Sequence, residues 1–482
     1  MNTKTNGGIS RAALIIIVCA SLAHFCLMAR HVALTAVFPY PVSYDESVAA
    51  MWAKRSLEGE TLYPQVKENP PYLHNPYTPL YARVTGMVME KSDNIFLSGR
   101  LLSLMSALAC AALIFRIAGQ CSNHGIGLAA GALFLFSPIA SRYAFMVRPD
   151  MLGLVYSLAG VCLISVSGTI PSAIMAGVLS ASALLTKQSF LAGPLAIILW
   201  SVLSKKRICA IYLITLIVCF FGGMILFAEE GLSEIVKHLI AMNLLSFDFS
   251  NFFAVISGAF NSHIFLLIVA VIFVVIGRKE KNPLWYYMIT SFLMAISSGK
   301  TGAEENHLLE TIALMCMSFG YVAGQNEIKR DGFMSWLLTA QLLLFFPVPA
   351  QSVFTRTYGQ EIVGRTDSIT PTEGDREASS LLIAEILSVP DPILCEDPGY
   401  LVVADKKVVL QPYQFAQLGR MGKWDDSLIV EMVKSREFGM IVLKSNPASG
   451  KSVFFSDEIL RAVSEYYTLR RHIGQFYVFD PG

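Results

Sequence analysis

The chain has 482 residues, of which 54% are hydrophobic and 15% are charged, and its formal net charge is +1. Soluble globular domains carry about 25% charged residues, so the deficit indicates that lipid surrounds much of this chain. A net charge near zero, without a basic or acidic tail, argues against nucleic acid as a partner. The composition predicts a polytopic α-helical membrane protein.

Apolar runs separated by short polar stretches define the membrane part. The first run starts at Ala12, and no small-residue cleavage site follows it, so we interpret it as a retained helix with a cytoplasmic N-terminus. About eleven crossings are predicted from the length of such runs. They are 12–37, 97–118, 124–140, 150–168, 171–186, 189–203, 208–228, 262–277, 283–298, 307–324 and 333–350.

The basic residues fix the direction of these crossings. Lysines and arginines cluster at 205–207, 278–281 and 329–330, and all three clusters fall in loops that the count places in the cytoplasm. A single helix over 171–203 would move two of these clusters outside, so two crossings are predicted there. The outward-facing segments are then 38–96, 141–149, 186–189, 229–261, 299–306 and the chain after about 351.

The C-terminal part differs in composition from the membrane domain, residues 1–351. Residues 352–380 are polar and rich in Thr, Ser, Gly and Glu, which is typical of a linker. Residues 381–482 are numerous enough for a core of their own. Strands are expected at 393–394, 400–403, 408–409, 440–443 and 475–479, and helices at 427–435 and 456–467. This alternation predicts a small extracytoplasmic α/β domain.

The first outer loop, 38–96, carries the acidic motif Tyr44-Asp45-Glu46. Prolines end the preceding span, and Ser43 or Asp45 can cap a helix that continues to Leu57. This helix combines apolar and charged residues, so we expect it to lie in the membrane interface and to hold Asp45 just above the hydrocarbon. The alternative is that Asp45 only caps the helix.

The next outer segments supply cations. Arg142 and Arg148 lie outside, against the usual charge distribution, and an anionic headgroup gives a reason for them, because guanidinium groups bind such anions well. Asp150 follows at a helix N-terminus, where the helix dipole stabilises its charge. Lys187, in the outer turn at 186–189, can bind a phosphate oxygen. Snorkelling side chains and a capping aspartate are the alternative.

Further polar residues of the outer loops are candidates for substrate contact. They are Tyr44, Tyr77, Tyr81, Gln188, Glu305, Asn306 and His307. Tyrosines at this level can also belong to the aromatic belt of the interface. A second interpretation makes Glu304, Glu305 and His307 ligands of a divalent metal, although adjacent side chains on a helix point about 100° apart. A third makes this turn only a polar helix cap, and no other cofactor is indicated.

These motifs follow one another in a defined order. The acidic motif is followed by a Tyr- and Pro-rich stretch, Gly99-Arg100, Arg148-Pro149-Asp150, Thr186-Lys187-Gln188 and a Gly-rich turn with Glu, Asn and His. The series resembles the GT-C superfamily of polyprenyl-phosphate-sugar-dependent glycosyltransferases. Within it, the series is most similar to bacterial aminoarabinose transferases and protein O-mannosyltransferases. The resemblance covers roughly residues 10–350.

The resemblance implies a GT-C-like helical domain with interfacial helices in the first outer loop, a sugar donor on a polyprenyl phosphate, and an unidentified lipid, glycan or protein acceptor. It places the protein in the bacterial inner membrane with a periplasmic C-terminal domain. Matched motif by motif, Asp45 is the implied general base of an inverting displacement, with Glu46 and Asp150 as further catalytic residues. Lys187, Arg148 and Arg142 are the implied phosphate-binding residues.

Three rival classes remain, of which the third, a non-catalytic scaffold, leaves Asp45 and Asp150 unexplained. A transporter or flippase would place ionisable residues near the midplane of the bilayer, often within inverted repeats. Here the spans carry almost no charge, the acids cluster at the outer helix ends, and no repeat is evident. A metal-dependent transferase of the same superfamily would need carboxylates that converge on a metal.

Overall fold

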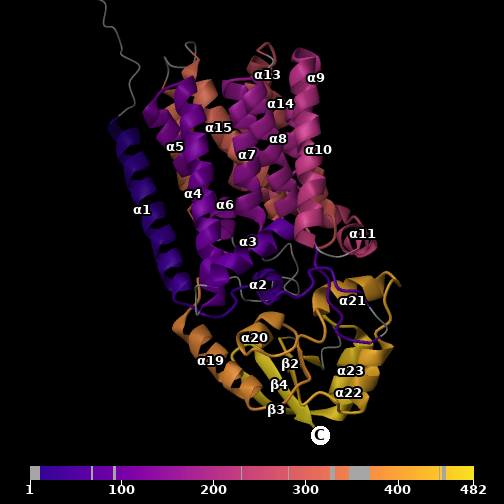
Figure 1. Cartoon of the computed structure of the whole chain (residues 1–482). Coiled ribbons are helices and arrows are strands. Elements are labelled where there is room, and N and C mark those ends of the chain that lie inside the picture. Colours follow the sequence, from indigo (N-terminus) through magenta and orange to yellow (C-terminus); the bar gives the residue numbers. More distant parts are fainter. Residues whose placement is uncertain are drawn as a thin grey trace, which may run out of the picture.

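The structure, a computed structural model, describes residues 11–66, 69–90, 94–228, 231–280, 282–325, 332–346, 370–444, 446–447 and 452–482. A bundle of helices forms one end of the molecule, and a smaller part that contains a β-sheet packs against the other end (Figure 1). Most of the predicted linker, up to residue 369, lies outside the described residues, as do the basic cluster at 329–330 and the end of the run at 333–350.

The bundle follows the apolar runs of the sequence, because a helix satisfies its own backbone hydrogen bonds where water is excluded. Every predicted run contains a helix. Its main helices are α1 (Arg11–Ala36), α4 (Ile95–Cys121), α5 (His124–Phe136), α6 (Pro138–Ala144), α7 (Asp150–Val166), α8 (Ile170–Thr186), α9 (Ala192–Ser204), α10 (Lys206–Ala228), α13 (Ile264–Gly277), α14 (Pro283–Met294), α15 (Leu309–Gly324) and α16 (Phe333–Leu344).

Four helical stretches of the described residues are each long and apolar enough to cross a membrane: α1, α4, α10 and the stretch 305–324. Two further pairs meet the same test together but are bent, α5 with α6 by 71° and α12 (Phe249–Ser262) with α13 by 92°. The remaining apolar helices are shorter. The expected number of about eleven crossings therefore stays a prediction.

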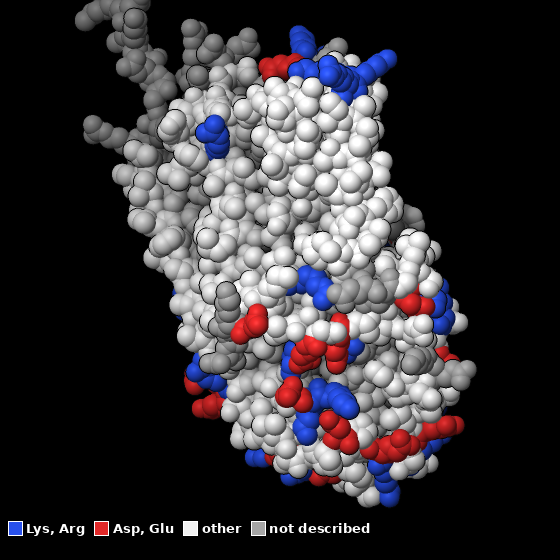
Figure 2. Space-filling view, in the orientation of Figure 1, with Lys and Arg blue, Asp and Glu red and all other residues white. Residues whose placement is uncertain are grey.

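Charged side chains gather toward the two ends of the molecule. On the face shown in Figure 2, lysines and arginines cluster at the end of the bundle away from the C-terminal part, and charges of both signs cover the C-terminal part. A broad band between them is almost free of charge. Large apolar side chains such as Ile214, Val218 and Ile225 of α10 are exposed on the bundle. A surface of this kind suits contact with lipid tails.

The first outer loop supplies two helices at the junction between the bundle and the C-terminal part: α2 (Tyr44–Leu57) and α3 (Pro79–Met89) (Figure 1). Helix α2 begins where predicted, because the Ser43 Oγ accepts a hydrogen bond from the backbone N of Glu46 at 3.2 Å. Ser43 is therefore the N-cap, and the interpretation of Asp45 as only a cap is wrong.

Other short elements complete the junction. The segment after α10 forms α11 (Leu232–Val236) and η1 (Lys237–Ala241), and the Gly-rich turn forms η2 (Ala295–Gly299) and η3 (Glu305–Leu308). The two regions are bonded to each other, since the backbone N of Asp248 donates to the Gly299 carbonyl and that of Thr301 to the Ser246 carbonyl. The sequence assigned no structure to the segment 229–261.

The C-terminal part contains a four-stranded sheet with the order β1-β2-β4-β3. Strand β1 pairs with β2 in parallel, and β4 pairs antiparallel with both β2 and β3. In register, Leu394 pairs with Ile441, and Val442 with Val478. Its elements are α19 (Glu373–Leu387), β1 (Ile393–Cys395), α20 (Pro398–Val403), α21 (Pro412–Arg420), α22 (Ser427–Lys434), β2 (Met440–Leu443), α23 (Asp457–Tyr466), β3 (Tyr467–Ile473) and β4 (Phe476–Pro481).

Several expectations for this part were wrong. Residues 400–403 are helical and not a strand, because Pro398 starts a helix and the Asp397 side chain accepts a hydrogen bond from the backbone N of Gly399 at 3.1 Å. Residues 408–409 form no strand, whereas 467–473 do. Helix α19 starts at Glu373, within the stretch expected to be a linker.

Side-chain and backbone hydrogen bonds attach the C-terminal part to the first outer loop. The Ser47 Oγ donates to the Asp397 Oδ1 at 2.5 Å, and Lys54 bonds the Asp405 carboxylate at 2.5 Å. The backbone N of Tyr72 donates to the Val409 carbonyl at 2.8 Å, and the backbone N of Gln411 donates to the Tyr72 carbonyl at 3.0 Å. These contacts place the C-terminal part directly over α2.

Gly399 packs closely against Ser47 of α2 in this interface. A Cβ atom there would lie 2.3 Å from the Ser47 Oγ and 2.8 Å from the Ser47 Cβ. We expect Gly399→Ala to loosen the interface and to cost about 1–3 kcal/mol of unfolding free energy through overpacking. Thermal unfolding and limited proteolysis of the purified protein measure this. Gly374→Ala is the control, since its new Cβ would have only an ordinary contact at 3.7 Å; equal stability of both variants would contradict the prediction.

Candidate active site

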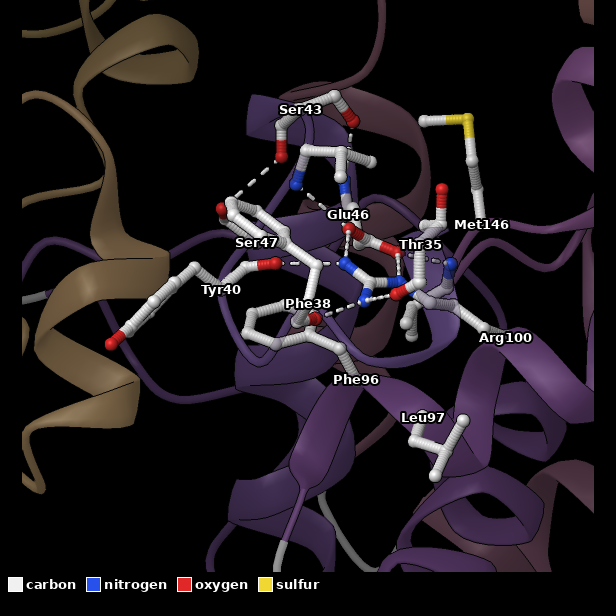
Figure 3. A network of polar contacts seen from close by, with 12 residues as sticks. Thr35, Phe38, Tyr40, Ser43, Glu46, Ser47, Phe96, Leu97, Arg100 and Met146 are labelled. Carbon is white, nitrogen blue, oxygen red and sulfur yellow. Dashed lines mark hydrogen bonds and ion pairs between the residues drawn. The ribbon is translucent and has the colours of Figure 1, made fainter. Parts of the chain in front are cut away.

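A buried ion pair fixes the start of α2. The Arg100 guanidinium, from α4, donates to both carboxylate oxygens of Glu46 at 2.9 and 2.8 Å, and neither side chain has any exposed surface (Figure 3). Arg100 also donates to the backbone carbonyls of Thr35, Phe38 and Tyr40 at 2.6 to 2.9 Å. One guanidinium thus joins the end of α1 and the chain leading to α2 to the start of α4.

Glu46 accepts two further hydrogen bonds, from the backbone N of Val42 at 3.0 Å and of Val147 at 2.9 Å. All of these partners belong to the protein, and the carboxylate has no exposed surface through which a substrate could reach it. These contacts support a positioning role for Glu46, and its expected catalytic role stays a prediction. Its position makes it the residue that holds Asp45, its neighbour in sequence, in place.

Arg148 lies at the centre of a cluster of charged side chains at the end of the bundle that adjoins the C-terminal part. Its Nη1 donates to the Asp45 Oδ2 at 2.9 Å and to the Glu304 Oε2 at 3.0 Å, and its Nε donates to the Asp150 Oδ2 at 3.1 Å. These three carboxylates come from α2, from the start of α7 and from the Gly-rich turn. The structure thus brings together residues that the sequence separates by more than a hundred positions.

Lys187 extends the cluster on the side of Asp150. Its Nζ donates to the Asp150 Oδ1 at 2.7 Å, and the Asn306 Nδ2 donates to the same oxygen at 2.8 Å. The ammonium also lies 5.6 Å from the centre of the Tyr77 ring, within the range of a cation–π contact. Four of the predicted site residues, Asp150, Lys187, Asn306 and Tyr77, are therefore in contact.

Arg142 and Tyr143 close the other side of the cluster. The Arg142 Nη1 donates to the Glu305 Oε1 at 2.7 Å, and the Tyr143 hydroxyl donates to the Glu304 Oε2 at 2.9 Å. The guanidinium of Arg148 lies 5.0 Å from the centre of the Tyr143 ring. The cations and carboxylates of the cluster therefore largely neutralise one another before any ligand binds.

Asp45 is the most exposed carboxylate of this cluster. Its side chain is 40% exposed, compared with 20% for Glu304, 6% for Glu305 and 1% for Asp150. Arg148 holds its Oδ2, whereas its Oδ1 has no hydrogen bond within the described residues. One oxygen of Asp45 is thus oriented by the protein and the other can meet a ligand.

The environment separates the acidities of Asp45 and Glu304. The protein packed around Asp45 displaces water and raises its pKa; Arg148 opposes this, and the charge of Glu304 adds to it. For Glu304, burial acts in the same direction, but Arg142, Arg148 and the Tyr143 hydrogen bond outweigh it and lower the pKa. Of the two carboxylates, Asp45 is therefore the better proton acceptor.

Some predicted substrate contacts lie elsewhere. Tyr81 is 2% exposed and packs in an apolar cluster with Ala50 and Phe96, because α3 turns this face toward α2, so its substrate contact stays a prediction. Gln188 donates to the Pro76 carbonyl at 2.7 Å and holds the first outer loop. Tyr44 faces the C-terminal part.

The residues proposed as alternative metal ligands do not converge. Glu304 points to Arg148 and Tyr143, Glu305 points to Arg142, and the His307 Nδ1 lies 2.7 Å from the Ser297 Oγ. Within the described residues, no three His, Cys, Asp or Glu side chains are arranged to hold a metal ion. The metal site formed by Glu304, Glu305 and His307 is therefore wrong for this arrangement.

Several residues of the site were not identified from the sequence as site residues. Arg100 was noted only as part of a motif, and Tyr143 only becomes visible through its contact with Glu304. Lys300 was noted only as a member of the Gly-rich turn; its nearest partner is the Asn243 Oδ1 at 3.5 Å. Burial and the nearby charge of Lys187 lower its pKa to about 8. A lysine in a Gly-rich outer turn was the available signal.

No protein-family model matches the chain, and a comparison with curated proteins gave no match. Solved structures do match. The fold is similar to ArnT from Cupriavidus metallidurans, both in the apo state and bound to undecaprenyl phosphate, with TM-scores of 0.62 and 12% identity over 97–98% of both chains. It is also similar to the archaeal oligosaccharyltransferase AglB from Archaeoglobus fulgidus, with a TM-score of 0.51 and 11% identity over 97% of this chain and 74% of that one.

The chain therefore has the fold of ArnT and AglB and the apolar helices of a multi-pass membrane protein, as the resemblance inferred from the order of its motifs implies. At 11–12% identity, these likenesses establish the fold and do not by themselves establish the reaction.

The Glu46–Arg100 pair gives a test of the site's foundation. Glu46→Gln leaves the Arg100 charge buried without its counter-ion, and we expect a loss of about 3–5 kcal/mol of unfolding free energy. Thermal unfolding of the purified protein measures it. The control is Asp405→Asn, which removes an ion pair whose carboxylate side chain is 87% exposed and should change stability little. Similar, small effects of both substitutions would refute the anchoring role.

Proposed function

We propose that the chain is a membrane glycosyltransferase that moves a sugar from a polyprenyl-phosphate donor to an acceptor hydroxyl, at the outer face of a bacterial inner membrane. The observation that carries the proposal is the placement of Asp45: an exposed carboxylate whose pKa is raised, held by Arg148 at the start of α2, where the bundle meets the C-terminal part (Figure 1). A general base needs this combination of access and basicity.

The fold supports a lipid-linked donor. One ArnT structure holds undecaprenyl phosphate, and the AglB structure holds a dolichol-phosphate together with an inhibitory peptide. The cluster around Arg148 lies at the end of the bundle, where the phosphate of a membrane-embedded lipid would be found. Nucleotide sugars are absent outside the cytoplasm, so a donor anchored in the membrane suits this position. A bilayer and an unidentified acceptor are then the partners.

In the proposed reaction the acceptor hydroxyl gives its proton to the Oδ1 of Asp45 as its oxygen attacks the anomeric carbon. The bond from that carbon to the phosphate oxygen breaks, and the polyprenyl phosphate leaves with the bonding electrons. Because a phosphate is a stable anion, its departure needs cations more than a general acid. A single displacement of this kind inverts the anomeric centre.

The cations for the leaving phosphate come from Arg148, Lys187 and Arg142, as the motifs imply, and we add Lys300. The first three are already bonded to carboxylates at 2.7 to 3.1 Å. Among the described residues, the Lys300 ammonium has only the 3.5 Å contact with the Asn243 side chain, and it lies close enough to Lys187 for their charges to repel each other. An incoming phosphate would relieve this repulsion.

Asp45→Asn tests the assignment of the base. The amide keeps the size of the side chain but cannot accept the proton, so we expect transfer from a polyprenyl-phosphate sugar to fall about 10²–10⁴-fold, with donor binding retained. Product formation by the purified protein in nanodiscs measures it, and Asp405→Asn again serves as control. Full activity of the variant would exclude Asp45 as the base, and activity that instead depends on a divalent metal would favour a different transferase mechanism.

Lys300 gives a pH prediction. Its pKa of about 8 means that the ammonium loses its proton, and with it the attraction for phosphate, as the pH rises through 8. We expect kcat/KM for the donor to fall on this alkaline side. Lys300→Arg keeps its charge and should move the decrease of kcat/KM to higher pH. Lys300→Gln should lower kcat/KM at all pH values and abolish its decrease at alkaline pH. Identical alkaline profiles in all three proteins would contradict the assignment.

A further inference from the structure

A cavity of about 350 Å³ opens in the C-terminal part, between α21 and the start of α23. Helix α21 lies on the side of the C-terminal part that faces α11, at the end of the bundle that adjoins the C-terminal part (Figure 1). The Gln414 Nε2 fixes it there by donating to the Met242 carbonyl at 2.9 Å. Gln414 is not among the lining residues, so this contact holds the helix while the cavity lies on another face of it.

Aromatic rings separate the cavity from Asp45. Phe454 lines the cavity, and its ring centre lies 5.0 Å from that of Tyr44 and 5.8 Å from that of Tyr413. Tyr44 directly precedes Asp45, and its hydroxyl accepts a hydrogen bond from the backbone N of Tyr413 at 3.2 Å. On the other side, the Tyr413 hydroxyl lies 3.0 Å from where a Cβ on Gly302 would be, in the turn that carries Glu304.

The lining of the cavity combines aromatic faces with hydrogen-bond acceptors. Trp424 and Phe454, which are partly exposed, contribute rings, and Asp425, Asp457 and Glu458 contribute carboxylates. Rings of this kind pack against the C–H faces of sugars, and carboxylates accept hydrogen bonds from their hydroxyls.

The charges of the lining exclude anionic ligands. Arg420 is the one cation among the lining residues that the structure describes, and its guanidinium is bonded to the carbonyls of Ser452 and Val453 at 2.5 and 3.4 Å. The Asp426 carboxylate, also in the lining, accepts a hydrogen bond from the Ser456 hydroxyl. A phosphorylated ligand would meet an excess of carboxylates, which repel it, whereas a neutral polyol would not.

We propose that this cavity is the acceptor subsite and that its ligand is a neutral glycan whose end lies toward Phe454, next to the start of α2 that carries Asp45. Its volume lies near the lower end of the range of about 300–1,000 Å³ for small-molecule sites, which suits one or two sugar units. The assignment to the acceptor rests on the proposed transferase function. The binding of a neutral glycan does not, and can be tested without the donor.

Gly419 allows a clean test, because it lines the cavity near the end of α21. A Cβ there would meet its nearest neighbours, atoms of Trp424, at ordinary distances of 3.7 and 3.8 Å, so Gly419→Leu should fill the cavity without disturbing the helix. The matched control is Gln417→Leu, which introduces the same side chain on the same helix at a position outside the lining. Thermal unfolding checks that both variants keep the fold.

The experiment is saturation-transfer NMR on the full-length protein in nanodiscs, with maltotriose, mannotriose and chitotriose as probes. Glucose 6-phosphate and a neutral Ser- and Thr-rich peptide serve as the competing classes. We expect at least one neutral trisaccharide to bind, about tenfold or more weaker in Gly419→Leu and unchanged in Gln417→Leu. Asp45→Asn should also bind it normally, which separates this result from a failure of the catalytic proposal.

Three results would overturn the proposal. The first is that no trisaccharide binds, and the second is that Gly419→Leu binds as tightly as the parent protein. The third is that only the phosphorylated sugar or the peptide binds in a manner that Gly419→Leu abolishes, which would assign the cavity to another class of ligand. Loss of sugar transfer in every variant, with glycan binding intact, would count against the proposed function alone.

Discussion

A guanidinium and a carboxylate without exposed surface, Arg100 and Glu46, are the constraint on which the rest of the site depends. Burying either charge alone would be very unfavourable, so the pair is stable only with good geometry and with every remaining donor and acceptor satisfied. Arg100 meets this condition with three backbone carbonyls, and Glu46 with two backbone N–H groups. The same bonds fix the exit of α1, the start of α2 and the loop before Arg148. Asp45 and Arg148 are thereby brought to within 2.9 Å.

The cluster around Arg148 divides roles among similar side chains. Asp150 is bonded by three donors and hardly exposed, which makes it a residue that orients Arg148 and Lys187. Glu304 has its pKa lowered, whereas Asp45 has it raised and keeps one oxygen accessible. Carboxylates with different environments commonly take different chemical roles. In the proposed reaction, these acids hold the cations until the phosphate of the donor competes for them.

The sequence allowed the helices to be predicted well because apolar runs and basic clusters are local signals. The order of the polar motifs also predicted that Asp45, Arg148 and Lys187 gather at one end. Contacts between residues far apart in the sequence could not be predicted in the same way. Arg100 lies at the start of an apolar run, and only the packing of the fold reveals that the Glu46 carboxylate neutralises its charge. Tyr81 was indistinguishable from Tyr77, since the face of α3 that is buried depends on where α2 lies. In the C-terminal part, the apolar residues 400–403 suggested a strand, but the cap formed by the preceding Asp and Pro starts a helix.

The central claim is that Asp45 acts as a base in a single displacement on a lipid-linked sugar. The anomeric configuration of the product tests it most directly, since a base and a nucleophile at this position lead to opposite stereochemistry. The measurement is NMR of the glycoside formed by the purified protein from a polyprenyl-phosphate sugar of known configuration. Inversion at the anomeric carbon is the predicted result, and retention would contradict the account.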